Sequence, residues 1–406
     1  MKPYCPVPQH AVAWDVISFP RGVFRPTRWS SGQIPATGSI APKVGTSAEG
    51  TRLGEDGRSG RTISTDQAVS RMSTKGVAGL VLLLAAGVGW WVSSSPAPRA
   101  GPSGVQRVSR TLMGTLWSIT VADHGRPEPA RSAAEEALRE VDRIEKLMSE
   151  WMPESPISQV NAAAGGKPVE VPAEVSALLQ RALAYGARSG GAFDVSWRGM
   201  GGIWRFDAGF RLPSAAEVEA GLRNVDYRAV RLQGNNVSLT RPGMAIGLGG
   251  IAKGYAVDRA AAVLRKAGFP DSLVAGAGDI MASGTKYGSP WRLAVQDPRG
   301  ERGQSLGTVA LRDAAISTSG DYERFQMVGG VRYHHIMDPR TGWPARGSMS
   351  VSVLAPTAEQ TDALATTLFV LGPEKGLALA RELGVDALII GDDGRRHATD
   401  GFAAFR

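Results

Sequence analysis

Three short segments of this 406-residue chain combine residue types that can bind anions, bind metals or move protons. The first is a glycine-rich stretch, 247–258, which runs into a predicted helix over 251–267. Free backbone N–H groups at such a helix start favour anions, and Lys253 adds a positive charge suited to a phosphate. A Walker A loop needs Gly before the lysine and Ser or Thr after it. Ala252 and Gly254 stand there, so this motif is excluded.

The same stretch satisfies a relaxed dinucleotide fingerprint. Gly247, Gly249 and Ala252 have the required spacing, and Asp271 lies roughly where a ribose-binding acid could be. The spacing leaves a nicotinamide oxidoreductase open as one alternative. A purely structural alternative also stays open, in which the glycines only allow close helix–strand packing and the lysine is solvated. A hairpin is predicted before the helix in place of a βαβ start, which counts against the fingerprint.

The second segment is 361–367, within a predicted helix. Asp362 and Thr366 are four residues apart, so their side chains lie on one helix face. A carboxylate and a hydroxyl are hard oxygen ligands, which suit Mg²⁺ better than zinc. An aspartate in the first turn of a helix is also a common partner of the helix dipole. Spacing alone therefore leaves both a metal site and a structural aspartate open.

The third segment joins 317–324 to 333–342 and contains two adjacent histidines, His334 and His335. Strand alternation points adjacent side chains to opposite faces, so one histidine can face a site while the other does not. The sequence that follows, 338–342, is a turn signal and is also compatible with a simple hairpin exit. Weaker candidates are the stretches 113–115, 149–161 and 191–194, whose aromatic residues could equally belong to the core.

Alternating helix and strand signals must position these segments. Helices are predicted over 135–148, 172–188, 251–267, 357–371 and 374–383, and a short one begins at Ser214. Strands are predicted over 110–121, 244–248, 272–276, 291–296, 307–312, 349–354 and 386–390, with hairpins at 229–240 and around Gly329-Gly330. Hairpins mixed with helices predict an α+β fold rather than a doubly wound sheet.

Composition narrows the class of protein. With 43% hydrophobic and 21% charged residues, the chain is neither wholly disordered nor a polytopic membrane protein. Its single cysteine, Cys5, excludes an intramolecular disulfide and a cysteine-based zinc site. The formal net charge is +8, but the first 75 residues hold ten basic and five acidic residues. The basicity is therefore no nucleic-acid footprint on the folded part, and we expect no nucleic-acid partner.

The N-terminal region has a composition of its own. Residues 1–71 lack a sustained period and are predicted to be disordered, or to precede a true start at Met72. Residues 76–92 form a 17-residue uncharged run behind Lys75. This pattern predicts a signal sequence or membrane anchor over 72–92, a linker over 93–106 and a folded domain over 107–406. No A-x-A cleavage site follows, which favours an uncleaved anchor over a cleaved signal.

Taken together and in order, these segments resemble the ApbE family, the FAD:protein FMN transferases. The resemblance extends from about 109 to 390. It rests on Met-Gly-Thr at 113–115, Ser-x-Trp…Ser-x-x-Asn around 149–161, Gly-Ala-Phe-Asp at 191–194, Gly-Gly-Ile-Ala-Lys-Gly-Tyr-Ala-Val-Asp at 249–258, Gly-Asp at 278–279, Thr-Ser-Gly-Asp-Tyr at 318–322, His-His-Ile-Met-Asp-Pro-Arg-Thr-Gly at 334–342 and Asp-Ala-Leu-Ala-Thr at 362–366.

The resemblance implies a function, a fold and a set of site residues. It implies a periplasmic, Mg²⁺-dependent enzyme with a single large T-fold-like α+β domain of mixed, largely antiparallel sheets. Such an enzyme transfers FMN from FAD to a Thr or Ser hydroxyl of a target protein, an electron-transfer flavoprotein, and releases AMP. The implied FAD contacts are Met113, Trp151, Ala192, Phe193, Asp194, Gly247, Lys253 and Ile336. The implied Mg²⁺ ligands are the Gly250 carbonyl, Asp362 and Thr366, and the candidate bases are His335 and Asp279.

One position departs from the family in a way that bears on function. Relatives usually carry an aspartate where this chain has Gly247. Two alternatives follow: a neighbouring carboxylate supplies the missing group, with Asp279 the first candidate, or the chain binds FAD without transferring FMN. On the first alternative we expect Gly247→Asp to raise activity and Asp279→Asn to reduce it. Trp151 replaces the usual tyrosine, and its indole can still stack on a flavin.

Overall fold

The computed structural model describes residues 104–403, except 208 and 302. The predicted N-terminal extension over 1–71, the anchor over 72–92 and nearly all of the linker over 93–106 lie outside the described residues.

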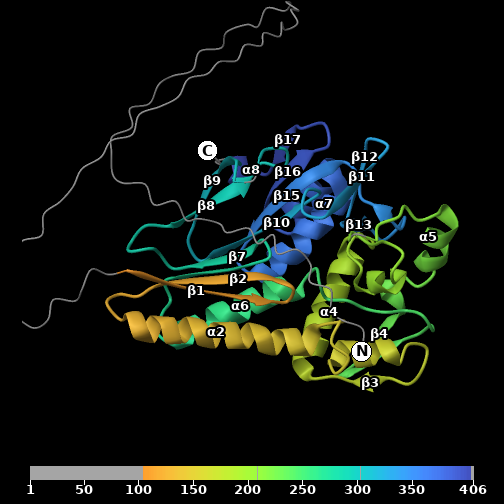
Figure 1. Cartoon of the computed structure of the whole chain (residues 1–406), viewed down its shortest axis with the longest axis horizontal. Helices are drawn as coiled ribbons and strands as arrows, with labels where there is room; N and C mark the ends of the chain where they lie inside the picture. Colours follow the sequence, from red (N-terminus) through yellow and green to blue (C-terminus); the bar gives the residue numbers. More distant parts are fainter. Residues whose placement is uncertain (1–103, 208, 302, 404–406) are drawn as a thin grey trace, which may run out of the picture. The chain divides into compact units, whose positions relative to one another are not determined.

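The described residues form helices and strands in alternation (Figure 1). The helices are α2 (Pro127–Met148), α3 (Pro156–Ala162), α4 (Ala173–Arg188), α5 (Ala215–Leu222), α6 (Ala252–Lys266), α7 (Ala358–Glu382) and α8 (Asp400–Ala403), with 3-10 turns η1 (Val195–Met200) and η2 (Tyr227–Ala229). The strands are β1 (Val105–Leu112), β2 (Thr115–Ala122), β3 (Val169–Glu170), β4 (Val230–Gln233), β5 (Asn236–Leu239), β6 (Ser272–Gly276), β7 (Asp279–Ser283), β8 (Trp291–Gln296), β9 (Ser305–Leu311), β10 (Ala314–Gly320), β11 (Phe325–Val328), β12 (Val331–His334), β13 (Met337–Asp338), β14 (Trp343–Pro344), β15 (Ser348–Ala355), β16 (Asp386–Gly391) and β17 (Arg396–Ala398).

An eight-stranded sheet in the order β1-β2-β6-β7-β10-β15-β16-β17 organises the fold. Each neighbouring pair in it is antiparallel. Helix α6 packs against both α2 and α7, and all three helices pack against the sheet. Trp291 and Leu293 of the β8–β9 hairpin form a second cluster with Leu273 and Ile280 of the sheet. The predicted α+β class with largely antiparallel sheets is confirmed.

Small side chains let the helices approach closely. The α2 positions 130, 134, 137, 138, 141 and 144 recur at helical spacing, and all of them are fully buried. On α6, Ala256, Ala260 and Ala261 are fully buried in the same cluster. Gly254 is the tightest point, because a Cβ placed on it would lie 2.1 Å from the carbonyl oxygen of Ala358 in α7. The sequence therefore specifies how near α6 and α7 come.

Two predicted strands are wrong, for identifiable reasons. The single strand over 110–121 is the β1–β2 hairpin, whose turn is formed by Met113 and Gly114 with φ of 51° and 70°. Strand-like sequence lies on both sides of the turn, and a Met-Gly pair is not a strong turn signal, which concealed it. The segment 244–248 is irregular, and the Gly247 N–H donates to the Val195 carbonyl of η1 at 2.8 Å.

The predicted hairpins and the helices predicted after 357 agree with the structure. The hairpins over 229–240 and around Gly329-Gly330 are confirmed as β4–β5 and β11–β12. The two helices predicted after 357 are the halves of α7, which is interrupted at Gly372 and Pro373. Within the described part of the chain, α7 is also the one helix long and apolar enough to cross a membrane, by length and composition only. Because 67% of its most apolar window is buried inside the fold, it has the character of a core helix.

Candidate active site

Two hairpin turns bring candidate residues to one end of the sheet. In β2 and β6, Trp117 lies opposite Gly276, so the β1–β2 turn with Met113 and the β6–β7 turn lie at the same end. Gly276 has no room for a side chain, because a Cβ would come within 2.6 Å of the Trp117 ring. The β6–β7 turn places Asp279 at the start of β7, opposite Ser317 of β10.

A cluster of three charged groups lies where α6, α7 and β7 meet. The Lys253 Nζ is 3.3 Å from Asp362 Oδ1 and 3.8 Å from Asp279 Oδ2. The backbone N–H of Gly254 donates to Asp362 Oδ2 at 3.0 Å. Both acidic residues are buried, with exposures of 4% for Asp279 and 5% for Asp362. The structure thus joins three predicted site residues that are far apart in the sequence.

The electrostatics of this cluster follow from burial. Burial and the negative charge of Asp362 raise the pKa of Asp279, in spite of the nearby lysine. Burial opposes the charge of Lys253, but Asp362 and Asp279 outweigh it and raise the lysine pKa. The Oδ2 atom of Asp279 is buried without a hydrogen-bond partner among the described residues. A buried carboxylate with a free oxygen is a natural place for a further cation or donor.

One side chain fixes the start of α7 relative to α6. Asp258 accepts hydrogen bonds from the backbone N–H groups of Ala358, at 2.8 Å, and Glu359, at 2.9 Å. It therefore satisfies two N–H groups at the N-terminus of α7 that have no partner inside the helix. This contact and the missing side chain of Gly254 set Asp362 one turn further along, beside Lys253.

The predicted metal ligands have suitable chemistry. Asp362 and Thr366 lie on one face of α7, and the Thr366 hydroxyl is 3.3 Å from that of Ser319. Gly250 precedes the first residue of α6 by two positions. No group of three or more His, Cys, Asp or Glu side chains suited to a metal occurs among the described residues. A metal here would therefore depend on hydroxyl and carbonyl oxygens as well, a hard donor set that fits Mg²⁺.

The two histidines occupy different environments, as strand alternation predicts. His334 is 2% exposed, and its Nε2 lies 2.9 Å from the Ala345 carbonyl oxygen. His335 is half-buried, its backbone N–H donates to the Arg324 carbonyl, and its Nδ1 has no partner among the described residues. Burial, the charge of Arg324 and the neighbouring His334 lower the pKa of His335 to about 3. His335 is therefore neutral at physiological pH.

The predicted flavin contacts separate into exposed and buried residues. Trp151 is 72% exposed, and the Arg198 guanidinium carbon lies 4.3 Å from its ring centroid. Phe193 is buried against the glycine-rich loop, where a Cβ on Gly250 would lie 3.2 Å from its Cε2. Ala192 and Ile336 are buried in one cluster with α7.

Asp194 has a structural role that its sequence context did not reveal. Its Oδ1 accepts from the Ser196 N–H at 2.7 Å and caps η1. Its Oδ2 accepts from the Tyr227 N–H at 2.9 Å. Both oxygens are therefore engaged inside the loop, and a contact from this residue to a ligand would come from its backbone.

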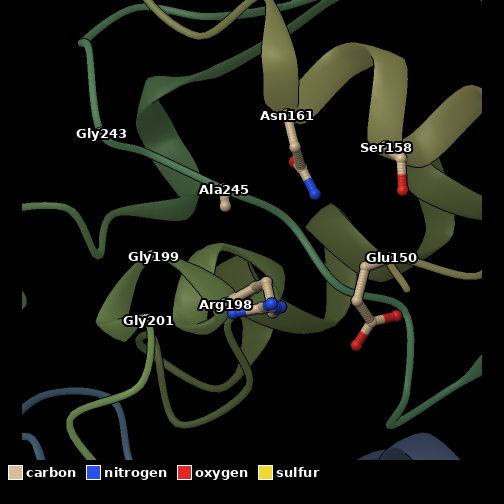
Figure 2. Close-up of a pocket in the computed structure, with 8 residues that line it drawn as sticks. All are labelled: Glu150, Ser158, Asn161, Arg198, Gly199, Gly201, Gly243 and Ala245. Carbon is tan, nitrogen blue, oxygen red and sulfur yellow. The ribbon is translucent and has the colours of Figure 1, made fainter. Parts of the chain in front are cut away.

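Figure 2 shows a pocket of about 310 Å³, whose lining includes Glu150, the residue before Trp151, and Arg198, which lies over the Trp151 ring. Polar side chains on its wall come from three segments, and backbone or small residues complete it. The lining residues are Glu150, Ser158, Asn161, Arg198, Gly199, Gly201, Gly243 and Ala245. The Asn161 side-chain amide accepts from the Ile246 N–H at 2.7 Å and donates to the Ile246 carbonyl at 2.8 Å, which fixes α3 against the segment that leads to Gly247.

Sequence reasoning missed three charged residues of this region. Glu150 directly precedes Trp151, so its position was the available signal. Arg324 ends a segment singled out for its motif, and its charge acts on both Lys253 and His335. Nothing in the sequence around Arg198 distinguishes it from a surface arginine.

The dinucleotide fingerprint is not supported. Helix α6 follows an irregular segment, and the sheet described here contains antiparallel pairs, so no βαβ unit surrounds the glycines. Asp271 does not reach a ribose site, because its Oδ1 accepts from the Thr285 N–H at 2.7 Å and its Oδ2 pairs with His124 at 2.8 Å. The nicotinamide oxidoreductase is thereby excluded as an interpretation of this motif.

Comparison with known proteins agrees with this geometry. The model of the ApbE family matches residues 113–389. An FAD:protein FMN transferase of Treponema pallidum is 37% identical over 323 residues, which cover 74% of this chain and 89% of the relative. One from Vibrio cholerae is 30% identical over 312 residues, 75% of this chain and 93% of the relative.

Solved structures are similar over the same region. The ApbE protein of Thermotoga maritima matches with a TM-score of 0.69 and 34% identity, over 74% of this chain and 99% of that chain. The flavin transferase ApbE of Vibrio cholerae matches with a TM-score of 0.67 and 30% identity, over 75% of this chain and 100% of that chain.

Proposed function

The chain belongs to the ApbE family, and we propose that it transfers the FMN moiety of FAD to a Thr or Ser hydroxyl of a target protein, with Mg²⁺, releasing AMP. The observation that carries the proposal is the cluster of Lys253, Asp279 and Asp362, together with the pocket lined by Glu150 and Arg198 and the exposed ring of Trp151. It combines a phosphate-binding cation, a hard-oxygen metal site and an aromatic surface for a flavin.

The proposed reaction is a phosphoryl-type displacement. The target hydroxyl oxygen attacks the FMN phosphorus, the bond from that phosphorus to the AMP phosphate oxygen breaks, and AMP leaves with the electron pair. The hydroxyl proton passes to a base. Asp362, Thr366 and the Gly250 carbonyl would hold Mg²⁺, which neutralises the charge of the pyrophosphate. Such a displacement depends mainly on positioning and charge neutralisation.

The chain's own residues have separate tasks in this proposal. Lys253 supplies a point charge to a phosphate, and the exposed face of Trp151 supports the flavin ring. We assign the proton to His335, because it is neutral and its buried Nδ1 has no hydrogen-bond partner among the described residues. An anionic ligand beside Arg324 and Lys253 would offset their charge and raise the His335 pKa towards its ordinary value. Asp279 is the alternative base, but it is buried and paired with Lys253.

The proposal extends to a location, which the sequence supports, and to a partner, which the family resemblance supports. We propose that the domain is held at the periplasmic face of the bacterial inner membrane, because an uncharged run over 76–92 precedes it. The proposed target is an electron-transfer flavoprotein. Deleting 1–92 should move the protein from the membrane fraction to the soluble fraction with FAD binding intact. Loss of folding in that variant would place the apolar run in the core.

The decisive experiment separates transfer from binding. The purified full-length chain is mixed with FAD, MgCl₂ and an unflavinylated electron-transfer protein. AMP is then measured by chromatography, and protein-bound FMN by in-gel fluorescence and mass. We expect equal amounts of both products, none in EDTA, and a loss of orders of magnitude in Asp362→Ala. Glu374→Ala, which changes an exposed acid on the same helix, is the matched control. FAD binding without AMP release would identify a flavin-binding protein instead.

A further inference from the structure

Gly247 is not required by its backbone conformation. Its φ is outside the left-handed region that the positive-φ glycines of this chain occupy. What limits the position is space. A Cβ placed there would lie 3.0 Å from Glu150 Oε1, 3.2 Å from Glu150 Cδ and 3.4 Å from Arg198 Cβ. The Glu150 carboxylate therefore lies in tight contact with the place of a side chain at 247, and a residue there would have to displace it slightly.

The Glu150 carboxylate has no side-chain partner among the described residues. The one hydrogen bond found to it there comes from its own backbone N–H. It nevertheless lines the pocket, where Figure 2 shows Arg198 and Asn161 pointing into the space beside it. Burial raises the Glu150 pKa, and the more distant charges of Arg198 and Lys253 lower it. Glu150 is half-buried, so a ligand that fills the pocket would displace water from its carboxylate and would have to supply a donor in its place.

The neighbouring residue indicates what kind of ligand group meets this carboxylate. Trp151 follows Glu150 directly, and its ring is largely exposed with Arg198 on one face. A planar heteroaromatic ring stacked on the indole would bring its polar edge near the pocket. FAD carries two such rings, and each has an N–H donor at its edge: the flavin imide and the adenine amino group.

We propose that Glu150 accepts a hydrogen bond from a ring N–H group of bound FAD, and that glycine at position 247 leaves the Glu150 carboxylate uncrowded in that place. The identity of the ligand rests on the proposed function. The proposal replaces Asp279 as the carboxylate that compensates for Gly247, since Asp279 is paired with Lys253. It also reverses an expectation from sequence: Gly247→Asp should weaken FAD binding, because it adds volume and a like charge beside Glu150.

A double-mutant cycle on the purified full-length protein tests the pairing. FAD affinity is measured by flavin fluorescence quenching for the wild type, Glu150→Gln, Glu150→Ala, Gly247→Asp and the double variant Glu150→Ala/Gly247→Asp. Glu150→Gln preserves the shape and should lower affinity about tenfold or more, as loss of a charge-assisted hydrogen bond does. Gly247→Asp should lower it similarly, and the double variant should bind better than Gly247→Asp. Glu154→Gln, an exposed acid of the same loop, is the control.

The outcomes are separable. Wild-type affinity in both Glu150 variants would overturn the proposal, as would simple additivity in the double variant. If Glu150→Ala fails to fold, Glu150→Gln still decides the question. Absence of FAD binding by the wild type would instead refute the proposed function. Competition by FMN and by AMP identifies the ring, because only the ligand that carries the contacted N–H should lose affinity in Glu150→Gln.

Discussion

Asp258 offers a direct test of how α6 holds α7. Its carboxylate accepts from two backbone N–H groups at the start of α7, those of Ala358 and Glu359. Asp258→Asn retains the shape of the side chain and removes its charge. The amide can accept only one of the two bonds, so the variant carries a penalty of about 1–3 kcal/mol that does not depend on pH.

The charged form of Asp258 is costly in the folded state. Burial raises the pKa of Asp258 from 3.8 to about 6, although the two N–H groups oppose this shift. The difference corresponds to about 3 kcal/mol at 1.36 kcal/mol per pH unit. Between these two values the folded state binds the proton more tightly than the unfolded state. This contribution to stability is therefore complete below pH 3.8 and is lost as pH rises to about 6.

Urea unfolding at a series of pH values from about 3.5 to 7.5 measures this contribution. The informative quantity is the free energy of unfolding of the wild type minus that of Asp258→Asn, in which the titrations of other groups cancel. We expect this difference to fall by about 3 kcal/mol across the window. A difference that stays constant, or that rises with pH, would refute the account of Asp258 as a buried, destabilised carboxylate.

Three further predictions concern the site. Gly254→Ala should cost about 1–3 kcal/mol in urea unfolding, because its Cβ would overlap the Ala358 carbonyl, and wild-type stability would contradict this close approach. Trp151→Ala should weaken FAD binding several-fold, as measured by fluorescence quenching, whereas Trp151→Phe should retain most of the affinity. If the two variants bind FAD equally well, the stacking role of Trp151 is wrong. His335→Gln should lower kcat by about 10²–10⁴ with unchanged FAD affinity, and a normal kcat would move the base to Asp279.

Much of the fold and the family could be predicted from local signals. Turn residues identified the β4–β5 and β11–β12 hairpins, and the helical spacing of apolar residues identified α4, α6 and α7. The resemblance to the ApbE family is confirmed by the family match over 113–389. It also led to Lys253, Asp279 and Asp362, which the structure brings together. These residues sit in contiguous motifs, which a single sequence displays.

The remaining features depend on distances between segments, which periodicity does not encode. The β1–β2 turn was missed because strand-like sequence lies on both sides of Met113 and Gly114, and this pair is not a strong turn signal. The role of Asp194 as a cap depends on Ser196 and Tyr227, and the latter approaches only after folding. The role of Glu150 could not be predicted, because a glycine in the sequence shows that a side chain is missing and not which residue lies in its place. Gly247 therefore suggested the loss of a carboxylate, although a carboxylate from another segment lies against this position.

The charges around Lys253 suit a pyrophosphate with its cation. The lysine Nζ lies 3.3 Å from Asp362 Oδ1 and 3.8 Å from Asp279 Oδ2. Burial and the charge of Asp362 raise the pKa of Asp279 and so favour its protonated form, which leaves Asp362 as the main counter-charge of the lysine. Arg324 adds a second positive charge, which acts on both Lys253 and His335. A phosphate that replaced Asp362 as the partner of Lys253 would therefore free carboxylate oxygens for a metal.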